Sequence, residues 1–195
     1  MQREWAEICS ALPSRTLFYP MAGYDIELPM KAFLPFVDHF WFVDIHYQVP
    51  GEPLLKNYGK SDHGQDCRRS TPLWKKWKFL ESASSVTVET GVTIKRQAPF
   101  EVQIQDEVYE CRESGRRIHV YKCKGKGYNV FRIAFRLTDR KLSVFFHRGD
   151  SPGEGGSNFH WLRGKVTRYV FKELDPGGVV VSDGSLAKKG FKVRF

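Results

Sequence analysis

Two runs of apolar residues flank a glycine turn and an amphipathic segment near the start of the chain. Residues 16–19 form the first run, and Pro20 and Gly23 follow it, which predicts a buried strand that ends in a tight turn. Residues 28–37 then carry apolar side chains at helical spacing. Apart from Asp44, residues 40–45 are aromatic or β-branched, and the run predicts a second buried strand. The pattern therefore predicts a βαβ unit with parallel strands and a right-handed crossover.

The same alternation returns near the other end of the sequence. Residues 142–146 predict a buried strand, and a glycine-rich loop follows them. The next segment predicts a helix, because its apolar residues share one helical stripe: Phe159, Leu162, Val166, Tyr169, Val170 and Leu174. Residues 175–178 read Asp-Pro-Gly-Gly and predict the end of that helix. Residues 179–181 then predict another buried strand. A short amphipathic helix is also predicted over residues 3–12.

The middle of the chain follows a different period. Residues 49–71 are rich in Pro, Gly, Asn, Asp and charged side chains, which predicts a long surface loop. A short helix is predicted within residues 72–82, around Trp74, Trp77 and Leu80. From residue 86 to residue 137 apolar residues alternate with polar ones, and glycines interrupt the pattern. This favours an antiparallel meander over residues 86–137, inserted between the parallel elements.

These elements define the expected fold class. We expect a single α/β domain over residues 1–195, with a Rossmann-like, mostly parallel sheet, helices on both faces and an inserted antiparallel β segment. The composition is globular, with 41% hydrophobic and 27% charged residues. There is no apolar run of membrane-spanning length, and the four cysteines are widely spread without a C-x-x-C pair. We therefore predict a cytoplasmic protein with reduced thiols.

Net charge is concentrated in one part of the sequence. Residues 56–150 hold 20 Lys and Arg against 11 Asp and Glu, so the entire net charge of +9 lies there. Aromatic residues interleave with the basic ones in this segment: Trp74, Lys75, Lys76, Trp77, Lys78, Arg116, Arg117, Tyr121, Lys122, Lys124, Lys126 and Tyr128. One hypothesis is a non-catalytic module that binds nucleic acid through phosphate contacts and base stacking. The alternatives are core aromatics and an ordinary solvated face.

Polar residues follow four of the predicted strands, at residues 19–25, 44–46, 147–150 and 182–185. In an open parallel sheet the carboxyl ends of the strands share one edge, and ligands bind in the crevice beyond that edge. Every one of these segments carries an acidic residue, three carry glycine and two carry histidine. The sequence therefore predicts a functional rim at this edge. The competing explanation is that turns favour Asp and Gly for conformational reasons alone.

The order of these elements carries a family resemblance. A strand, a glycine turn, a helix and a strand ending in an acid are followed later by Leu174, Pro176 and paired glycines before residues 179–181. This resembles the class I S-adenosylmethionine-dependent methyltransferases, over about residues 1–48 and 141–185. The resemblance implies S-adenosylmethionine as a cofactor, bound by Tyr19, Gly23, Asp25 and Asp44. In that family the acid after the second strand, here Asp44, holds the ribose. Asp150 and His147 would line the methyl-acceptor site.

The loop after residues 142–146 has chemistry of its own. Arg148 follows the strand directly, and the Gly-Glu-Gly-Gly-Ser run at residues 153–157 enters the predicted helix. Backbone amides of Gly155, Gly156 and Ser157, together with Arg148, predict a site for a small anionic or nucleotide-like ligand. The run lacks a Gly-Lys-Ser/Thr end, so it is not a P-loop. A flexible connector is the alternative. Asp44 and His46 could share a metal ion with Asp25, Asp62 or His63, but their spacing matches no recognisable metal motif, so no metal site is predicted.

Overall fold

The structure is a computed structural model, and it describes residues 7, 10–23, 25–55, 76–90, 100–137, 141–148, 161 and 164–182. Ten elements follow one another along these residues: β1 (Thr16–Pro20), α2 (Glu27–Phe33), β2 (His39–Asp44), β3 (Trp77–Thr90), β4 (Phe100–Cys111), β5 (Arg117–Lys124), α3 (Gly127–Leu137), β6 (Leu142–His147), α4 (Gly164–Glu173) and β7 (Leu174–Ser182). Most of the predicted helix over residues 3–12 lies outside the described residues. Among the described helices, none combines the length and apolar character needed to cross a lipid bilayer.

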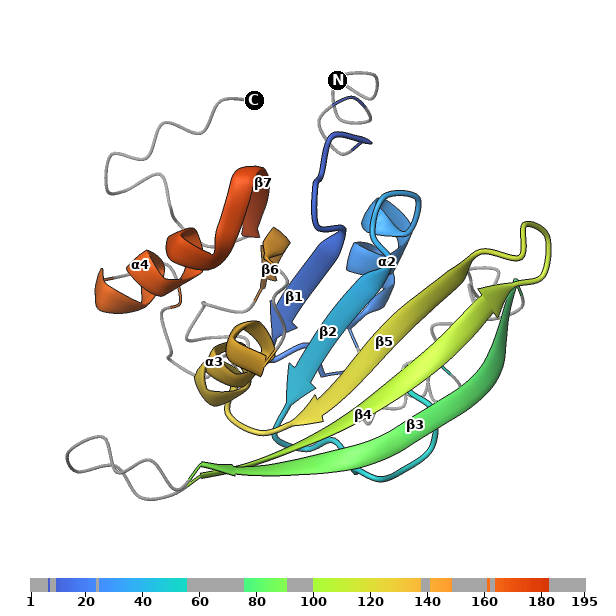
Figure 1. The fold of residues 1–195 in the computed structure, drawn as a ribbon, viewed down its shortest axis with the longest axis horizontal. Coiled ribbons are helices and arrows are strands. Elements are labelled where there is room, and N and C mark those ends of the chain that lie inside the picture. The colour runs from blue at the N-terminus through green and yellow to red at the C-terminus, as the bar shows by residue number, and fades with distance from the viewer. Residues whose placement is uncertain are drawn as a thin grey trace.

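All seven described strands belong to one mixed sheet, in the order β3-β4-β5-β2-β1-β6-β7 (Figure 1). β1 pairs in parallel with both β2 and β6, which confirms the predicted βαβ unit. β2 also pairs in parallel with β5, and β6 with β7. β4 runs antiparallel to β5 and to β3. The α/β class is confirmed, but the prediction of a mostly parallel sheet is only partly right, because the five strands from β5 to β7 pair in parallel whereas β3 and β4 pair antiparallel.

Three local predictions are wrong. Residues 77–82 do not form a helix, because Trp77 begins β3 and pairs with Cys111 of β4. The segment 86–137 is not a meander throughout, since β5 joins the parallel part of the sheet and Gly127–Leu137 is the helix α3. Residues 175–178 do not separate a helix from a strand, because β7 already begins at Leu174. In each case a pairing or packing partner distant in sequence outweighs the local pattern.

The hydrophobic core has two clusters that draw on alternate residues of the same strands. Leu17 and Tyr19 of β1 lie in the first cluster, whereas Phe18 lies in the second. This is the period of a strand, in which successive side chains point to opposite faces of the sheet. Met30 and Phe33 of α2, with Ile26 just before the helix, lie in the first cluster, and Val130, Phe131 and Ala134 of α3 lie in the second. Spacings of three or four residues place Ile26, Met30 and Phe33 on one helical face, and likewise Phe131 and Val130 with Ala134.

Phe18 lies at the centre of the second cluster. Its ring contacts those of Phe131 and Phe145, with centroids 5.1 and 6.2 Å away, and that of Trp161 at 6.1 Å. These residues come from β1, α3, β6 and the segment before α4. Because such aromatic pairs add packing energy to the area that they bury, the cluster fixes how the helices sit against the sheet.

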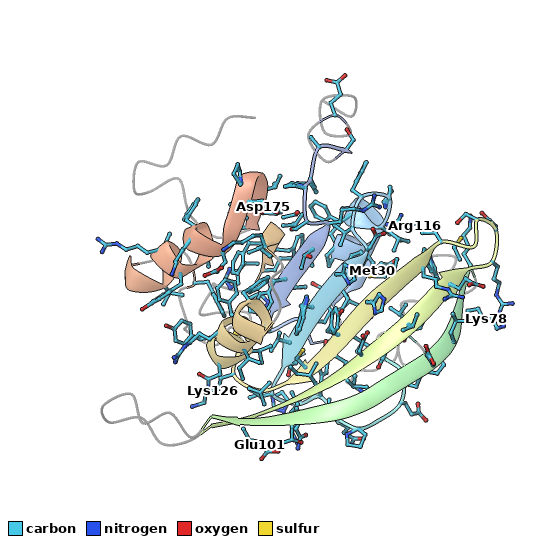
Figure 2. All side chains as sticks on the ribbon, viewed as in Figure 1. Met30, Lys78, Glu101, Arg116, Lys126 and Asp175 are labelled. Carbon is cyan, nitrogen blue, oxygen red and sulfur yellow. The ribbon has the colours of Figure 1, made fainter. Side chains whose placement is uncertain are left out.

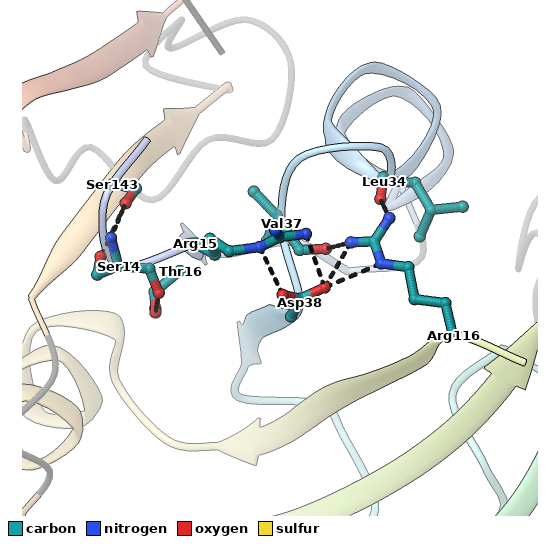
Figure 3. Close-up of polar contacts among 8 residues, drawn as sticks. All are labelled: Ser14, Arg15, Thr16, Leu34, Val37, Asp38, Arg116 and Ser143. Atoms are coloured by element: carbon teal, nitrogen blue, oxygen red, sulfur yellow. Dashed lines mark hydrogen bonds and ion pairs between the residues drawn. The ribbon is translucent and has the colours of Figure 1, made fainter. Parts of the chain in front are cut away.

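Polar contacts close the amino ends of the central strands (Figure 3). Arg116 donates to the Asp38 carboxylate, with its Nη2 2.5 Å from Oδ1, and to the carbonyl oxygens of Leu34 and Val37. Arg15 binds the same carboxylate at 2.5 Å from Nε to Oδ2. On the other side of β1, the Ser14 amide donates to the Ser143 hydroxyl at 3.1 Å. The ends of β1, β2, β5 and β6 are therefore joined at this edge by side chains.

Gly127 offers a test of how tightly α3 is seated. A methyl group at Gly127 would lie 2.8 Å from Trp161 Cζ2 and 2.9 Å from Pro20 Cβ. We therefore expect Gly127→Ala to lower the free energy of unfolding by about 1–3 kcal/mol, despite the better helix propensity of alanine. Chemical denaturation would measure this. The exposed neighbour Lys126 provides the control, Lys126→Ala, which should change stability by less than about 0.5 kcal/mol. Equal stability of the two variants would contradict the close packing.

Candidate functional site

The parallel strands place their carboxyl ends along one edge of the sheet, and a tight turn follows β1 there. Met21 and Gly23 both have positive φ angles, of 56° and 49°. The Ala22 amide donates to the Val43 carbonyl oxygen at 2.8 Å, so the turn folds across the end of β2. Glycine adopts the left-handed conformation without steric cost, which explains why Gly23 occupies the second of these positions.

Asp44, the last residue of β2, holds this turn. Its Oδ2 accepts a hydrogen bond from the Gly23 amide at 3.0 Å, and its Oδ1 accepts one from the His46 amide at 2.8 Å. A side chain at Gly23 would approach the same carboxylate, because an added Cβ would lie 3.8 Å from Oδ2. Tyr47 secures the turn from another direction, since its hydroxyl donates to the Gly23 carbonyl oxygen. Gly23 and Asp44, predicted as cofactor residues, are therefore in direct contact.

Arg148 and Asp25 also come together at this edge. Arg148 directly follows β6, and its Nη1 lies 2.6 Å from Oδ2 of Asp25, just beyond the β1 turn. Their side chains are 41% and 54% exposed, so the pair lies at the surface. Such an exposed ion pair contributes little to stability. Another anion could therefore replace the Asp25 carboxylate beside Arg148 at little cost. The basic residue predicted to bind an anion is thus held beside the turn by a carboxylate that an anionic ligand would have to replace.

Two other predicted site residues lie in the core. Tyr19 is buried in the first cluster, and its ring centroid is 4.9 Å from that of Phe146. His147 is fully buried at the end of β6, with its ring stacked on Phe145 at 6.2 Å. These positions give both side chains a packing role in the structure. The remaining predicted site residues, Asp150, Gly155, Gly156 and Ser157, lie outside the described residues.

A buried polar network on β4 and β5 was not predicted from the sequence. Gln105, Glu107 and Lys122 are all buried, although each is polar or charged. Gln105 forms two hydrogen bonds with the backbone of Gly51: its Oε1 accepts from the amide at 2.9 Å and its Nε2 donates to the carbonyl oxygen at 3.1 Å. Lys122 Nζ donates to the Glu52 carbonyl oxygen at 2.8 Å. The network therefore attaches the segment after β2 to the sheet.

Glu107 is the centre of this network. Its Oε2 accepts hydrogen bonds from the Leu54 amide at 2.8 Å and from the Tyr109 hydroxyl at 2.5 Å. Its Oε1 accepts one from Gln105 Nε2 at 3.2 Å. Burial raises the pKa of the Glu107 carboxyl from an ordinary 4.5 to about 7, although Tyr109, Leu54 and Lys122 each act to lower it. Burial likewise raises the pKa of the Tyr109 phenol and lowers the pKa of the Lys122 ammonium.

The sequence of β4 contains the polar residues of this network, but their spacing allows two interpretations. Gln105, Glu107 and Tyr109 alternate with Ile104, Asp106 and Val108, which is also the pattern of a strand with one solvated face. The structure shows that the polar side of this alternation faces the first core cluster, which contains Tyr109. The two-residue alternation of a strand does not by itself show which of its faces packs against the core.

A second unpredicted group consists of rings on the other face of β2 and β5. His39 and His119 are register partners whose rings stack at 5.0 Å, and Trp41 and Tyr121 are partners that stack at 4.1 Å. His119 Nδ1 lies 3.1 Å from both carboxylate oxygens of Asp106. Within the described part of the chain, no group of three or more His, Cys, Asp and Glu side chains is arranged to hold a metal ion.

Among the residues that the structure describes, the basic side chains of the middle segment do not all gather on one surface. Arg116 is bound at the amino ends of the strands, Lys122 is buried in the network and Trp77 lies in the first core cluster. Figure 2 shows Lys78 and Lys126 at opposite ends of the sheet. Several of the charges that suggested a nucleic-acid surface therefore have structural partners.

Comparison with known proteins gives no relative, since no family model, no curated protein and no solved structure matches the chain.

The bonds around Asp44 predict a stability effect. Asp44→Ala leaves the Gly23 and His46 amides without their acceptor, and the loss should lower the free energy of unfolding by about 1–3 kcal/mol. Thermal or chemical denaturation would measure it. The control is Glu113→Ala, which removes a carboxylate that is 68% exposed and paired only with Lys76 among the ion pairs described here. We expect a change below about 0.5 kcal/mol for the control. Indistinguishable variants would show that Asp44 does not hold the turn.

Proposed function

We propose that this chain binds S-adenosylmethionine, or a closely related adenosyl ligand, at the carboxyl ends of β1, β2 and β6, as a divergent S-adenosylmethionine-dependent methyltransferase. The observation that carries the proposal is the order of the parallel strands, β5-β2-β1-β6-β7. From β1 the chain proceeds outward to β2 on one side and later to β6 on the other, so the order reverses between β1 and β6. In doubly wound sheets, ligands bind in the crevice at such a reversal.

The packing supports the same architecture. α2 contributes to one core cluster, and α3 and α4 contribute to the other. Because these clusters draw on opposite faces of β1, we infer that helices flank both faces of the sheet, as in doubly wound folds. In this arrangement the loops beyond the carboxyl ends diverge and leave room for a ligand.

The residues at the edge fit an adenosyl ligand. Each carboxylate oxygen of Asp44 accepts one backbone amide and has a further lone pair, so the same group would accept hydrogen bonds from the ribose hydroxyls. Gly23 presents backbone without a side chain next to this acid. Asp25 and Arg148 would lie near the charged amino-acid end of the ligand. Such a ligand supplies an electrophilic methyl group, and the protein's own contribution is to position it and to exclude water.

A direct binding measurement tests this function. Isothermal titration with S-adenosylmethionine and S-adenosylhomocysteine should give a saturable signal with the wild-type chain. Asp44→Asn should weaken both ligands by about 10-fold or more, because an uncharged amide replaces the carboxylate that accepts the ribose hydroxyls. Glu113→Gln, far less constrained at the surface, should bind as the wild type does. The absence of binding and of a thermal shift at millimolar ligand would refute the proposal.

Arg148 provides an independent test of an anionic group on the ligand. Arg148→Ala should weaken binding of S-adenosylmethionine by about 1.5–3 kcal/mol, because a charge-assisted hydrogen bond to its carboxylate is lost. Stability should change by less than about 1 kcal/mol, because the Arg148 ion pair with Asp25 is exposed. Titration and denaturation of the same variant would measure both quantities. A variant that unfolds, or that binds S-adenosylmethionine with unchanged affinity, would show that Arg148 has a structural role and does not contact the ligand.

A further inference from the structure

The segment that follows β2, residues 45–55, contacts the turn after β1 and the strand β4, which are separated in the sheet by β2 and β5. At one end, the Tyr47 hydroxyl donates to the Gly23 carbonyl oxygen in the candidate site. At the other end, the Leu54 amide donates to Glu107 on β4. Between them, Val49 is buried in the same core cluster as Tyr47, Leu54 and Leu55. Buried side chains therefore anchor the segment at intervals, at Tyr47 beside the β1 turn, at Val49, and at Leu54 and Leu55 beside the buried network, with exposed residues between them.

We propose that the Glu107 carboxyl group is a proton-controlled latch on residues 51–55, and that Tyr47 is a positioning residue that carries the state of this latch to the Gly23 turn. The geometry supports this role because Glu107 is fully buried and directly accepts the Leu54 amide. The consequence for ligand affinity rests on the function proposed above, but the latch itself does not.

The groups facing Glu107 come from each element packed on it. Tyr109 and Gln105 lie on the same strand, and Asp106 acts on Glu107 as a neighbouring negative charge. From β5, Lys122 is the nearby positive charge. From the segment, Glu52 acts on Lys122 through its charge and accepts the Lys122 ammonium with its carbonyl oxygen. Among the described residues, Lys122 is therefore the cation that offsets an ionised Glu107, and it is already engaged by the segment.

The direction of the effect follows from proton linkage. With the segment closed, burial raises the pKa of Glu107 to about 7, whereas an opened segment would return it toward 4.5. Between these values the closed form binds more protons than the open form, so closure is favoured at lower pH. Stability of the closed segment should fall as the pH rises through this window and level off above about 7. Over pH 5.5 to 8 the closing equilibrium should weaken by about 30-fold.

Amide hydrogen exchange tests the latch without any ligand. After correction for intrinsic exchange rates, protection of the Leu54 and Leu55 amides should fall by about 30-fold between pH 5.5 and pH 8 in the wild type. Glu107→Gln should make this protection independent of pH. The matched control is Glu110→Gln, on the same strand, where the carboxylate is partly exposed and pairs with Arg117. This control should keep the wild-type profile.

A second pair of variants separates the parts of the proposal. Tyr47→Phe should keep the pH dependence at Leu54 but remove it from the Gly23 amide, because the hydroxyl that joins the segment to the turn is lost. Tyr109→Phe removes a hydrogen bond that lowers the pKa of Glu107, so the midpoint should move to higher pH. This variant keeps the latch testable if Glu107→Gln does not fold.

Three results would overturn the latch: wild-type protection at Leu54 that is independent of pH, a dependence that persists in Glu107→Gln, or a Tyr109→Phe midpoint that does not move. Unchanged pH dependence at Gly23 in Tyr47→Phe would overturn the positioning role. Titration with S-adenosylmethionine then reports the proposed function separately, since its failure would leave the exchange profile of Leu54 unaffected.

Discussion

β1 is covered on both of its faces and paired along both of its edges. All five of its residues are buried, and its backbone pairs with β2 on one side and β6 on the other. A strand in this position can connect to the rest of the chain only through its ends, and its parallel neighbours must reach it by crossover connections. The carboxyl ends of β1, β2 and β6 therefore meet at one edge. The position of the candidate site follows from the burial of this strand.

The antiparallel part of the sheet has a different constraint. Its face toward the first core cluster carries Gln105, Glu107 and Lys122, which are buried polar or charged groups. Burying such groups costs free energy unless each finds a partner. The backbone of residues 51–55 supplies partners to all three, through Gly51, Leu54 and Glu52. The network thus favours this placement of the segment, because losing it would remove the protein partners of these donors and acceptors.

The strands that the sequence predicted well are those buried on both faces. Apolar residues dominate the runs 16–19, 40–44 and 142–146, which lie in β1, β2 and β6, whereas Ile45 at the end of the second predicted run lies beyond β2 and is exposed. Prediction failed where long-range partners decided the structure. The predicted alternation extended to residue 137, yet Ile133 and Phe135 lie in the helix α3, which buries both in the second cluster, together with Val130. Gly23, Asp25, Asp44 and Arg148 were all placed at the rim from the strand ends, but the sequence did not predict the specific ion pair between Arg148 and Asp25.

The two ends of the sheet differ in how firmly their polar groups are bound. At the amino ends, the Arg116 guanidinium contacts one carboxylate and two backbone carbonyl groups, and Asp38 is shared with Arg15. A ligand could not displace such a contact without exposing several unsatisfied groups. At the carboxyl ends, the ion pair of Arg148 and Asp25 is exposed, so either partner can be exchanged at little cost. A ligand loses little binding energy when it replaces weak contacts, whereas it would lose much when it breaks a buried network. The polar contacts at the amino ends of the strands are therefore firmly bound, whereas those at the carboxyl ends can be replaced. In parallel sheets, ligands bind at the carboxyl ends of the strands.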